Sequence, residues 1–309
     1  MAVETPSAKS FIDPQTLMRI RNLELRARVV VQGFWNGLHR SPYHGFSVEF
    51  TEYRQYVPGD DPRWIDWKLF ARSDRHYLKK FEDETNLRCQ LLVDASRSMG
   101  YGSGAYTKSD YANTLAATVA YFLSKQGDAV GLLTFDEAVR DYLPPRNRPG
   151  HLRHMMLALE KASAGTTTDL ITPLNRAVEL SRRRGLMVLI SDLLAGLDRF
   201  EASLAALSAC GHEVVVFHVL DPAELNFEFN KAALFRDIES GQELYIDPVP
   251  ARREYLRKFT AHTDGVEATC RKLGAAYHRL TTDRPLELAL FDYMRGRMQR
   301  GKFVRRNLQ

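Results

Sequence analysis

The sequence predicts an α/β fold with a doubly wound, mostly parallel sheet, and two patterns carry this prediction. Short apolar runs, such as residues 90–94 and 186–192, have the length and composition of buried parallel strands, and each ends in an aspartate. Amphipathic stretches that are typical of helices lie between such runs. Strands that alternate with helices favour right-handed crossovers, which cover both faces of the sheet with helices.

The segments of this repeating unit follow one another from residue 87 onward. We expect strands at residues 90–94, 129–134, 139–143, 186–192, 213–219 and 276–280, with the third ending before the prolines at 144 and 145. We expect helices at residues 111–126, 151–162, 170–184, 200–210, 252–273 and 285–298. Pro173 must then lie in the first turn of its helix.

Composition changes along the chain and predicts three parts. Residues 1–86 interleave aromatic and charged residues around a weak helical pattern, and we expect them to form an appended N-terminal subdomain. Residues 87–298 form the predicted main domain, in which residues 222–248 are an insertion of extended segments. Residues 299–309 form a basic tail.

Bulk composition is that of a soluble globular protein. The chain has 309 residues, of which 44% are hydrophobic and 26% charged. Its start has no signal-peptide pattern, and no apolar run has the ~18 to 20 residues that a membrane-spanning helix needs. The three cysteines have no metal-type spacing, which predicts reduced thiols and a cytoplasmic location.

The net charge of +5 is concentrated at the C-terminus. Residues 295–309 contain six Lys or Arg and no Asp or Glu, so the residues before them carry a net charge of −1. Such a tail could contact nucleic acid or an anionic lipid. We favour a solvated chain end instead, and we do not expect nucleic acid to be the partner.

The residues that point to chemistry are Asp94, Ser96 and Ser98, directly after the strand predicted at 90–94. Alternate residues that leave the carboxyl end of a strand can converge on one point at the rim of the sheet. One carboxylate and two hydroxyls make an oxygen-only ligand set, which suits Mg²⁺ first and Mn²⁺ as the alternative. Zinc would call for His or Cys. The other interpretation of this segment is a serine-rich loop in which Asp94 caps the following helix.

Two further residues are predicted to reach the same rim. Thr168, in the segment GTTTDL, can offer a hydroxyl, and Asp192, in LISDL, can bind the ion directly or through water. A dication with so few protein carboxylates remains short of negative charge. An Asp or Glu of a partner protein could therefore complete its coordination shell.

This pattern resembles the metal-ion-dependent adhesion site of von Willebrand factor A domains, in which Asp-x-Ser-x-Ser is followed by a later Thr and a later Asp. The resemblance implies a von Willebrand factor A-like fold with Asp94, Ser96, Ser98, Thr168 and Asp192 around a metal. The family has a single Thr before its acid whereas three stand here, so Thr168 is chosen for its place before Asp169. Thr167 stays an alternative.

A second resemblance covers most of the chain, from about residue 20 to residue 298. The segment from Glu49 to Trp67, the following Ala71-Arg72 and the later segment from Asp221 to Glu224 are similar to the domain-of-unknown-function family fifty-eight. Members often accompany MoxR-type AAA+ ATPases, which implies an adaptor in the chaperone-like assembly or maturation of client proteins. Many relatives carry membrane helices near their start, and this chain shows none.

We therefore expect a non-enzymatic adaptor that uses its metal to bind the ATPase, its client or both through an acidic side chain. One alternative is a metal-dependent phosphoester hydrolase, but its second carboxylate would be needed where Ser96 stands, and His151 and His154 are expected at the surface. Another is nucleotide binding, although residues 100–104 match neither common glycine-rich motif. Nucleic-acid binding through the tail would depend steeply on salt.

Overall fold

In a computed structural model, the protein is described over residues 12–40, 52–55, 77–80, 87–161, 170–181, 183–229, 231, 233–236 and 243–293. At its centre lies a six-stranded sheet in the order β10-β7-β6-β3-β4-β5. The strands are β3 (Arg88–Asp94), β4 (Ala129–Phe135), β5 (Val139–Arg146), β6 (Leu186–Ser191), β7 (Glu213–Leu220) and β10 (Ala276–Thr281).

The order of the strands makes this sheet doubly wound. From β3 the chain moves to β4 and β5 on one side, and it then returns to β6, β7 and β10 on the other. All neighbouring pairs are parallel except β4 and β5. The predicted α/β class with a mostly parallel sheet is therefore confirmed. The winding reverses between β3 and β6, and in open α/β sheets ligands bind beyond the carboxyl ends of the strands at such a point.

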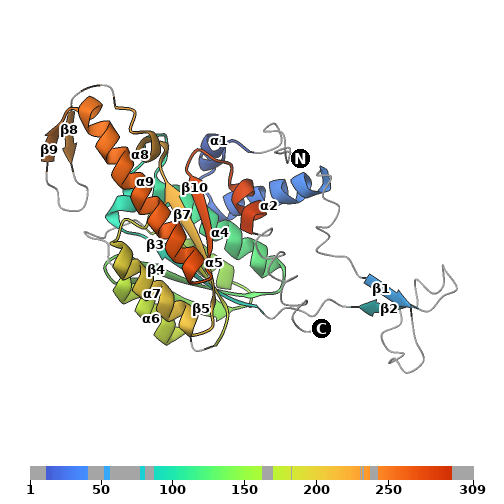
Figure 1. The fold of residues 1–309 in the computed structure, drawn as a ribbon. Helices are drawn as coiled ribbons and strands as arrows, with labels where there is room; N and C mark the ends of the chain where they lie inside the picture. Colours follow the sequence, from blue (N-terminus) through green and yellow to red (C-terminus); the bar gives the residue numbers. More distant parts are fainter. Residues whose placement is uncertain are drawn as a thin grey trace.

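Helices cover both faces of the sheet (Figure 1). One face carries α4 (Lys108–Lys125) and α5 (His151–Leu159), with α2 (Leu23–Arg40) packed on α4. The other carries α6 (Ile171–Leu180), α7 (Leu197–Ala209) and α9 (Pro248–Lys272).

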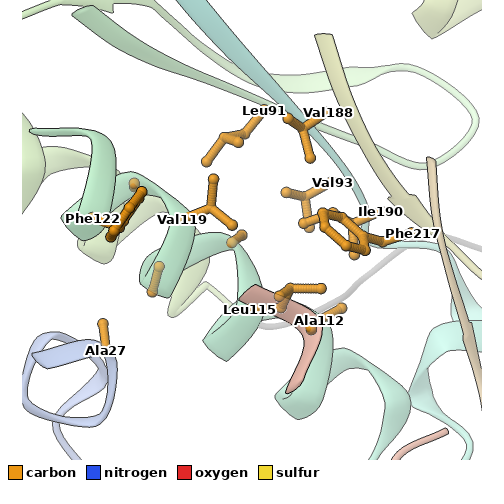
Figure 2. Close-up of a cluster of buried hydrophobic side chains, with 14 of the residues drawn as sticks. Ala27, Leu91, Val93, Ala112, Leu115, Val119, Phe122, Val188, Ile190 and Phe217 are labelled. Carbon is orange, nitrogen blue, oxygen red and sulfur yellow. The ribbon is translucent and has the colours of Figure 1, made fainter. Parts of the chain in front are cut away.

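Each strand supplies apolar side chains to both layers, because successive residues of a strand point to opposite faces. Leu91 and Val93 pack on the α4 side, and Leu92 belongs to the cluster on the α7 side. Figure 2 shows the first cluster, in which strand residues such as Val188 and helix residues such as Leu115 converge. The strands that end at the predicted metal ligands are therefore packed on both faces.

The strand β5 is longer than predicted. It continues through Pro144 and Pro145 to Arg146, where we expected a break. The prolines are tolerated because β5 is an edge strand that pairs with β4 alone, so their missing N–H groups leave no second neighbour unbonded.

The helix α4 begins at Lys108 rather than at residue 111, and its cap explains the difference. Thr107 accepts a hydrogen bond from the Asp110 backbone N–H while Asp110 accepts one from the Thr107 N–H, which forms a capping box. The cap of α4 is therefore Thr107 and not Asp94. Pro173 lies in the first turn of α6, as predicted.

The expectation that His151 lies at the surface is wrong. Its side chain is buried at the start of α5, with Nε2 within 2.8 Å of the Val130 carbonyl oxygen. The amphipathic pattern of this helix did not show which of its turns the sheet would cover.

The inserted segment 222–248 begins with a short helix, α8 (Pro222–Asn226), and contains a hairpin of β8 (Ala233–Arg236) and β9 (Glu243–Ile246). Aromatic rings join these elements to α9: the Phe227 ring stacks on Tyr255 with centroids 4.3 Å apart and on Phe235 at 5.9 Å. The prediction of extended segments is thus correct for the hairpin and missed α8.

The N-terminal elements include α1 (Pro14–Met18), α2, and a hairpin of β1 (Glu52–Gln55) and β2 (Tyr77–Lys80). Phe34 of α2 is buried against Phe122 of α4 and against Phe291, which lies in a helical stretch over residues 286–293. The division at residues 86 and 298 stays a prediction, and the basic tail lies outside the described residues. Within the described part of the chain, no helix has the length and apolar character needed to span a membrane.

Candidate metal centre

Asp94 lies at the carboxyl end of β3, beside the end of β6, where the winding of the sheet reverses. Its side chain is almost fully buried, and both oxygens accept hydrogen bonds. Oδ1 accepts the backbone N–H of Ser96 at 2.8 Å, and Oδ2 accepts the Ser191 hydroxyl at 2.6 Å. Each oxygen keeps a second lone pair, so the carboxylate is held in place and can still accept a cation.

The two hydroxyls of the motif lie next to each other. Ser96 is the N-cap of a short 3₁₀ helix, Arg97–Gly100, which turns the chain back and brings Ser98 over the end of β3. The Ser96 and Ser98 Oγ atoms are 3.1 Å apart, and both side chains are buried. Two neighbouring oxygens on an octahedral Mg²⁺, each ~2.1 Å from the ion, are themselves ~3.0 Å apart.

Asp192 follows β6 and has a fixed backbone. The Asp192 carbonyl can only accept, so His218 donates to it from Nε2 (2.8 Å) and receives the Tyr277 hydroxyl at Nδ1 (2.8 Å). Burial lowers the pKa of His218 to about 4, which keeps the ring neutral for this pair of bonds. The next residue, Leu193, has a φ of 52°, a left-handed conformation that a leucine rarely adopts.

The Asp192 side chain is fully buried and only half satisfied. Its Oδ2 accepts the Lys108 ammonium at 2.8 Å. Its Oδ1 has no hydrogen-bond partner among the described residues. A buried carboxylate oxygen without a partner is costly, and a bound cation would satisfy it.

Lys108 is itself fully buried and binds two carboxylates. Besides Asp192, its ammonium donates to Glu224 Oε1 at 2.6 Å. Burial would lower the pKa of Lys108, but the charges of Asp192 and Glu224 and their hydrogen bonds outweigh it and raise the pKa. The lysine is therefore a permanent cation at this rim.

Glu224 connects this ion pair to α8 and to the loop after the metal motif. Its Oε2 accepts the backbone N–H of Asp221 in the capping box of α8. Asp221 in turn accepts the Ser103 N–H at 2.9 Å and the Ser103 hydroxyl at 2.5 Å. The start of α8 thus fixes the loop that leads from Ser98 to α4.

The charges of the rim are not balanced. Four carboxylates are buried or mostly buried here, those of Asp94, Asp192, Asp221 and Glu224, and the Lys108 ammonium pairs with two of them, Asp192 and Glu224. Burial raises the pKa of Asp94 to about 7, and the nearby charge of Asp192 adds to the effect, against the hydrogen bonds from Ser191 and Ser96. A divalent cation at this point would offset both the burial of the Asp94 charge and its repulsion by Asp192, and would lower the pKa of Asp94.

The structure therefore brings Asp94, Ser96, Ser98 and Asp192 to one rim, and these residues fit a hard divalent cation. Thr168, with the alternative Thr167, lies outside the described residues. No group of three or more His, Cys, Asp or Glu side chains among the described residues has the arrangement of a metal site. Two of the five predicted ligands are serine hydroxyls, and serines do not count toward such a group.

Four side chains of the rim were not predicted: Ser191, His218, Lys108 and Glu224. Ser191 stands in the segment LISDL and Glu224 in the segment DPAE, so both residues belong to segments that the sequence analysis had already singled out. His218 stands near the end of an apolar strand, where a polar residue indicates a specific buried contact. A single lysine at the start of a helix gives no signal, because most such lysines are exposed.

A family model described as "Protein of unknown function DUF58" matches residues 52–265. Among the curated relatives, the "Uncharacterized protein Rv1480" of Mycobacterium tuberculosis is 33% identical over 278 residues, which are 88% of this chain and 86% of that protein.

Solved structures that are similar to this chain include von Willebrand factor A-like proteins. BatB from Bacteroides thetaiotaomicron has a TM-score of 0.46 at 16% identity, over 69% of this chain and 99% of that one. The SpRpn10 VWA domain has a TM-score of 0.40 at 12% identity, over 66% of this chain and 94% of that one. Proximal thread matrix protein 1 from the mussel byssus, "with zinc occupied MIDAS motif", has a TM-score of 0.34 at 18% identity, over 43% of this chain and 38% of that one.

The relative and the family model establish descent, because each covers well over half of the chain. The chain belongs to the DUF58 family.

Proposed function

We propose that the protein is a non-enzymatic adaptor that binds an acidic side chain of a protein partner through a divalent cation. The cation is Mg²⁺, with Mn²⁺ as the alternative. Asp94, Ser96 and Ser98 are its core ligands, and Asp192 and Thr168 complete or steady the shell. The partner is a MoxR-type AAA+ ATPase or its client, in the assembly or maturation of that client.

One observation carries the proposal. Two buried carboxylates, Asp94 and Asp192, lie close enough to repel each other where the winding of the sheet reverses, and the hydroxyls of the metal motif lie beside them. Asp192 Oδ1 has no partner in the described part of the chain, and the charge of Asp192 helps to raise the pKa of Asp94. Oxygen ligands of low total charge suit a cation that retains open positions for water or for a partner's carboxylate.

The surroundings of the site support binding rather than catalysis. Among the described rim residues, Asp94 and Asp192 are occupied by the proposed cation, and His218 and Lys108 are committed to fixed partners. Neither is poised to act as a general base at neutral pH, because the pKa of His218 falls to about 4 and that of Lys108 is raised.

The first test is metal binding by the protein alone. We expect Mg²⁺ to raise the melting temperature of the wild-type protein and to have no such effect on Ser96→Ala. The matched control is Ser203→Ala, because Ser203 is a buried serine of α7 whose hydroxyl has no partner among the described residues. A Ser96→Ala protein that responds like wild type would contradict the proposal.

The second test is partner binding. A purified MoxR-type ATPase, or its client, is titrated against the wild type, Ser96→Ala and Ser203→Ala at one constant Mg²⁺ concentration. Constant Mg²⁺ is needed because the ATPase uses Mg²⁺ for its own nucleotide, so that EDTA would act on both proteins. We expect Ser96→Ala alone to lose affinity. Equal affinity of all three proteins would show that the metal does not mediate this contact.

A further inference from the structure

Lys108 lies where a lysine is hard to keep. Its side chain has 0% exposure, whereas lysines are almost never fully buried unless they are paired. It is also the first residue of α4, and the positive end of a helix dipole disfavours a cation there. Two unfavourable effects are thus overcome at one residue, which points to a specific role for its charge.

The partners of Lys108 explain how the ammonium is held. It donates to Asp192 Oδ2 at 2.8 Å and to Glu224 Oε1 at 2.6 Å, and it lies 5.9 Å from the centre of the Tyr101 ring. Asp192 follows β6, and Glu224 lies in α8, the short helix that follows β7. The lysine therefore joins three elements that meet at the rim of the sheet.

One of these two carboxylates also belongs to the proposed metal site. Asp192 gives one oxygen to Lys108, and its other oxygen has no partner among the described residues. A fixed monovalent cation and an exchangeable divalent cation would then share a single carboxylate. Positive charges only a few ångströms apart repel strongly in a buried environment.

We infer that Lys108 is a positioning residue that acts as a built-in counter-ion of the metal site. It holds Asp192 and Glu224 in place when no divalent cation is bound, and it weakens the binding of that cation. This inference rests on the proposed function and names its regulation: metal binding is kept weak, so that a partner's acid is needed to complete a stable shell.

The test compares Lys108→Met with Lys125→Met. Lys125 is a good control because it lies on the same helix, with its ammonium 5.5 Å from the centre of the Tyr121 ring, but it is part of no rim contact. Thermal unfolding is measured in EDTA and through a titration with MgCl₂. We expect Lys108→Met to melt lower in EDTA, because it leaves buried carboxylates without a counter-ion, and to bind Mg²⁺ at least ~tenfold more tightly. Lys125→Met should match wild type in Mg²⁺ affinity.

A second variant covers the case in which Lys108→Met does not fold in EDTA. The double variant Lys108→Met/Glu224→Gln removes one carboxylate together with the ammonium and so keeps the charge of the rim unchanged. We expect it to fold in EDTA and to retain the tighter Mg²⁺ binding. Glu224→Gln alone, which keeps the ammonium beside Asp192, should bind Mg²⁺ no more tightly than wild type.

The outcomes separate this inference from the proposed function. If wild type responds to Mg²⁺ and the two Lys108 variants bind Mg²⁺ as tightly as wild type or more weakly, the inference is overturned and the proposed metal site stands. If only the two Lys108 variants respond, the inference holds, and the expected stabilisation of the isolated wild-type protein by Mg²⁺ is wrong. If no variant responds, there is no metal site and both ideas fall.

Discussion

The middle and the carboxyl end of the same two strands differ in chemistry although both are buried. In the middle of β3 and β6, Leu91, Val188 and Ile190 have no exposure and pack against α4. At the ends, Asp94 and Asp192 are 1% and 0% exposed and are surrounded by hydroxyls and an ammonium. Burial alone therefore does not say what a residue contributes.

The two regions have opposite effects on stability. Burial of an apolar side chain stabilises the fold by ~1.5–3 kcal/mol, whereas a buried charge destabilises it unless it is paired. The apolar burial in the middle of the strands stabilises the fold enough to offset the cost of the buried charges at the rim. In the proposed function, the rim is stabilised further when a divalent cation binds, so the comparison predicts which variants will respond to metal.

The largest effect is expected in the middle. Phe217→Ala removes a fully buried ring of β7, and such truncations cost ~3–5 kcal/mol of unfolding free energy. Denaturant unfolding measures this loss, and any folded Phe217→Ala protein should still be stabilised by Mg²⁺, because the rim is unchanged. A cost of under ~1 kcal/mol would contradict the division between the two regions. Tyr245→Ala, at a side chain with 71% exposure, is the control.

An intermediate effect is expected at Asp94 and depends on pH. The pKa of Asp94 is raised from an ordinary 3.8 to about 7, so the folded protein binds a proton more tightly than the unfolded chain does. Metal-free stability should then fall as the pH rises between these values, and the full penalty persists above about 7. Asp94→Asn has no such charge. In EDTA at about pH 8 we expect it to melt several degrees above wild type, and at about pH 5 much less so.

The control for this measurement is Asp198→Asn, at an exposed carboxylate in the first turn of α7. A difference between Asp94→Asn and wild type that stays constant from about pH 5 to about pH 8 would refute the unfavourable charge at the rim.

The smallest effect concerns how Mg²⁺ at the rim changes the rate at which the buried parts of the fold open. Cys210 is exposed, whereas Cys89 and Cys270 are buried, and burial raises the pKa of Cys270 to about 12. At about pH 8, iodoacetamide should modify Cys210 quickly and the two buried thiols only through opening of the fold. Mg²⁺ should slow the two buried thiols a few-fold and leave Cys210 unchanged, as mass spectrometry can measure. Equal rates with and without Mg²⁺ at Cys89 would show that the rim does not stabilise its own strand.

Most of the fold was predictable because the strands are short apolar runs with helices between them. The errors fall where tertiary position overrides a local signal. Pro144 and Pro145 look like a break, but an edge strand tolerates them. His151 looks like a surface residue, but the helix that carries it lies against β4.

The meeting of the candidate ligands at one rim was predictable, and their counter-ion was not. Asp94, Ser96, Ser98 and Asp192 could be found because they follow strands directly, and strand order fixes where the ends of strands meet. Lys108 could not be found in this way. Its importance depends on α4 starting beside the ends of β6 and β7, a relation between elements that are distant in the sequence.

The two prolines of β5 have a consequence for how the molecule meets other proteins. An uncovered edge strand offers N–H and C=O groups to which a strand of another copy can add, the first step of many aggregates. Because the N–H groups of successive strand residues point to opposite edges, the pair Pro144 and Pro145 removes such a donor from the outer edge of the sheet. Growth of the sheet by strand addition is therefore hindered on this side.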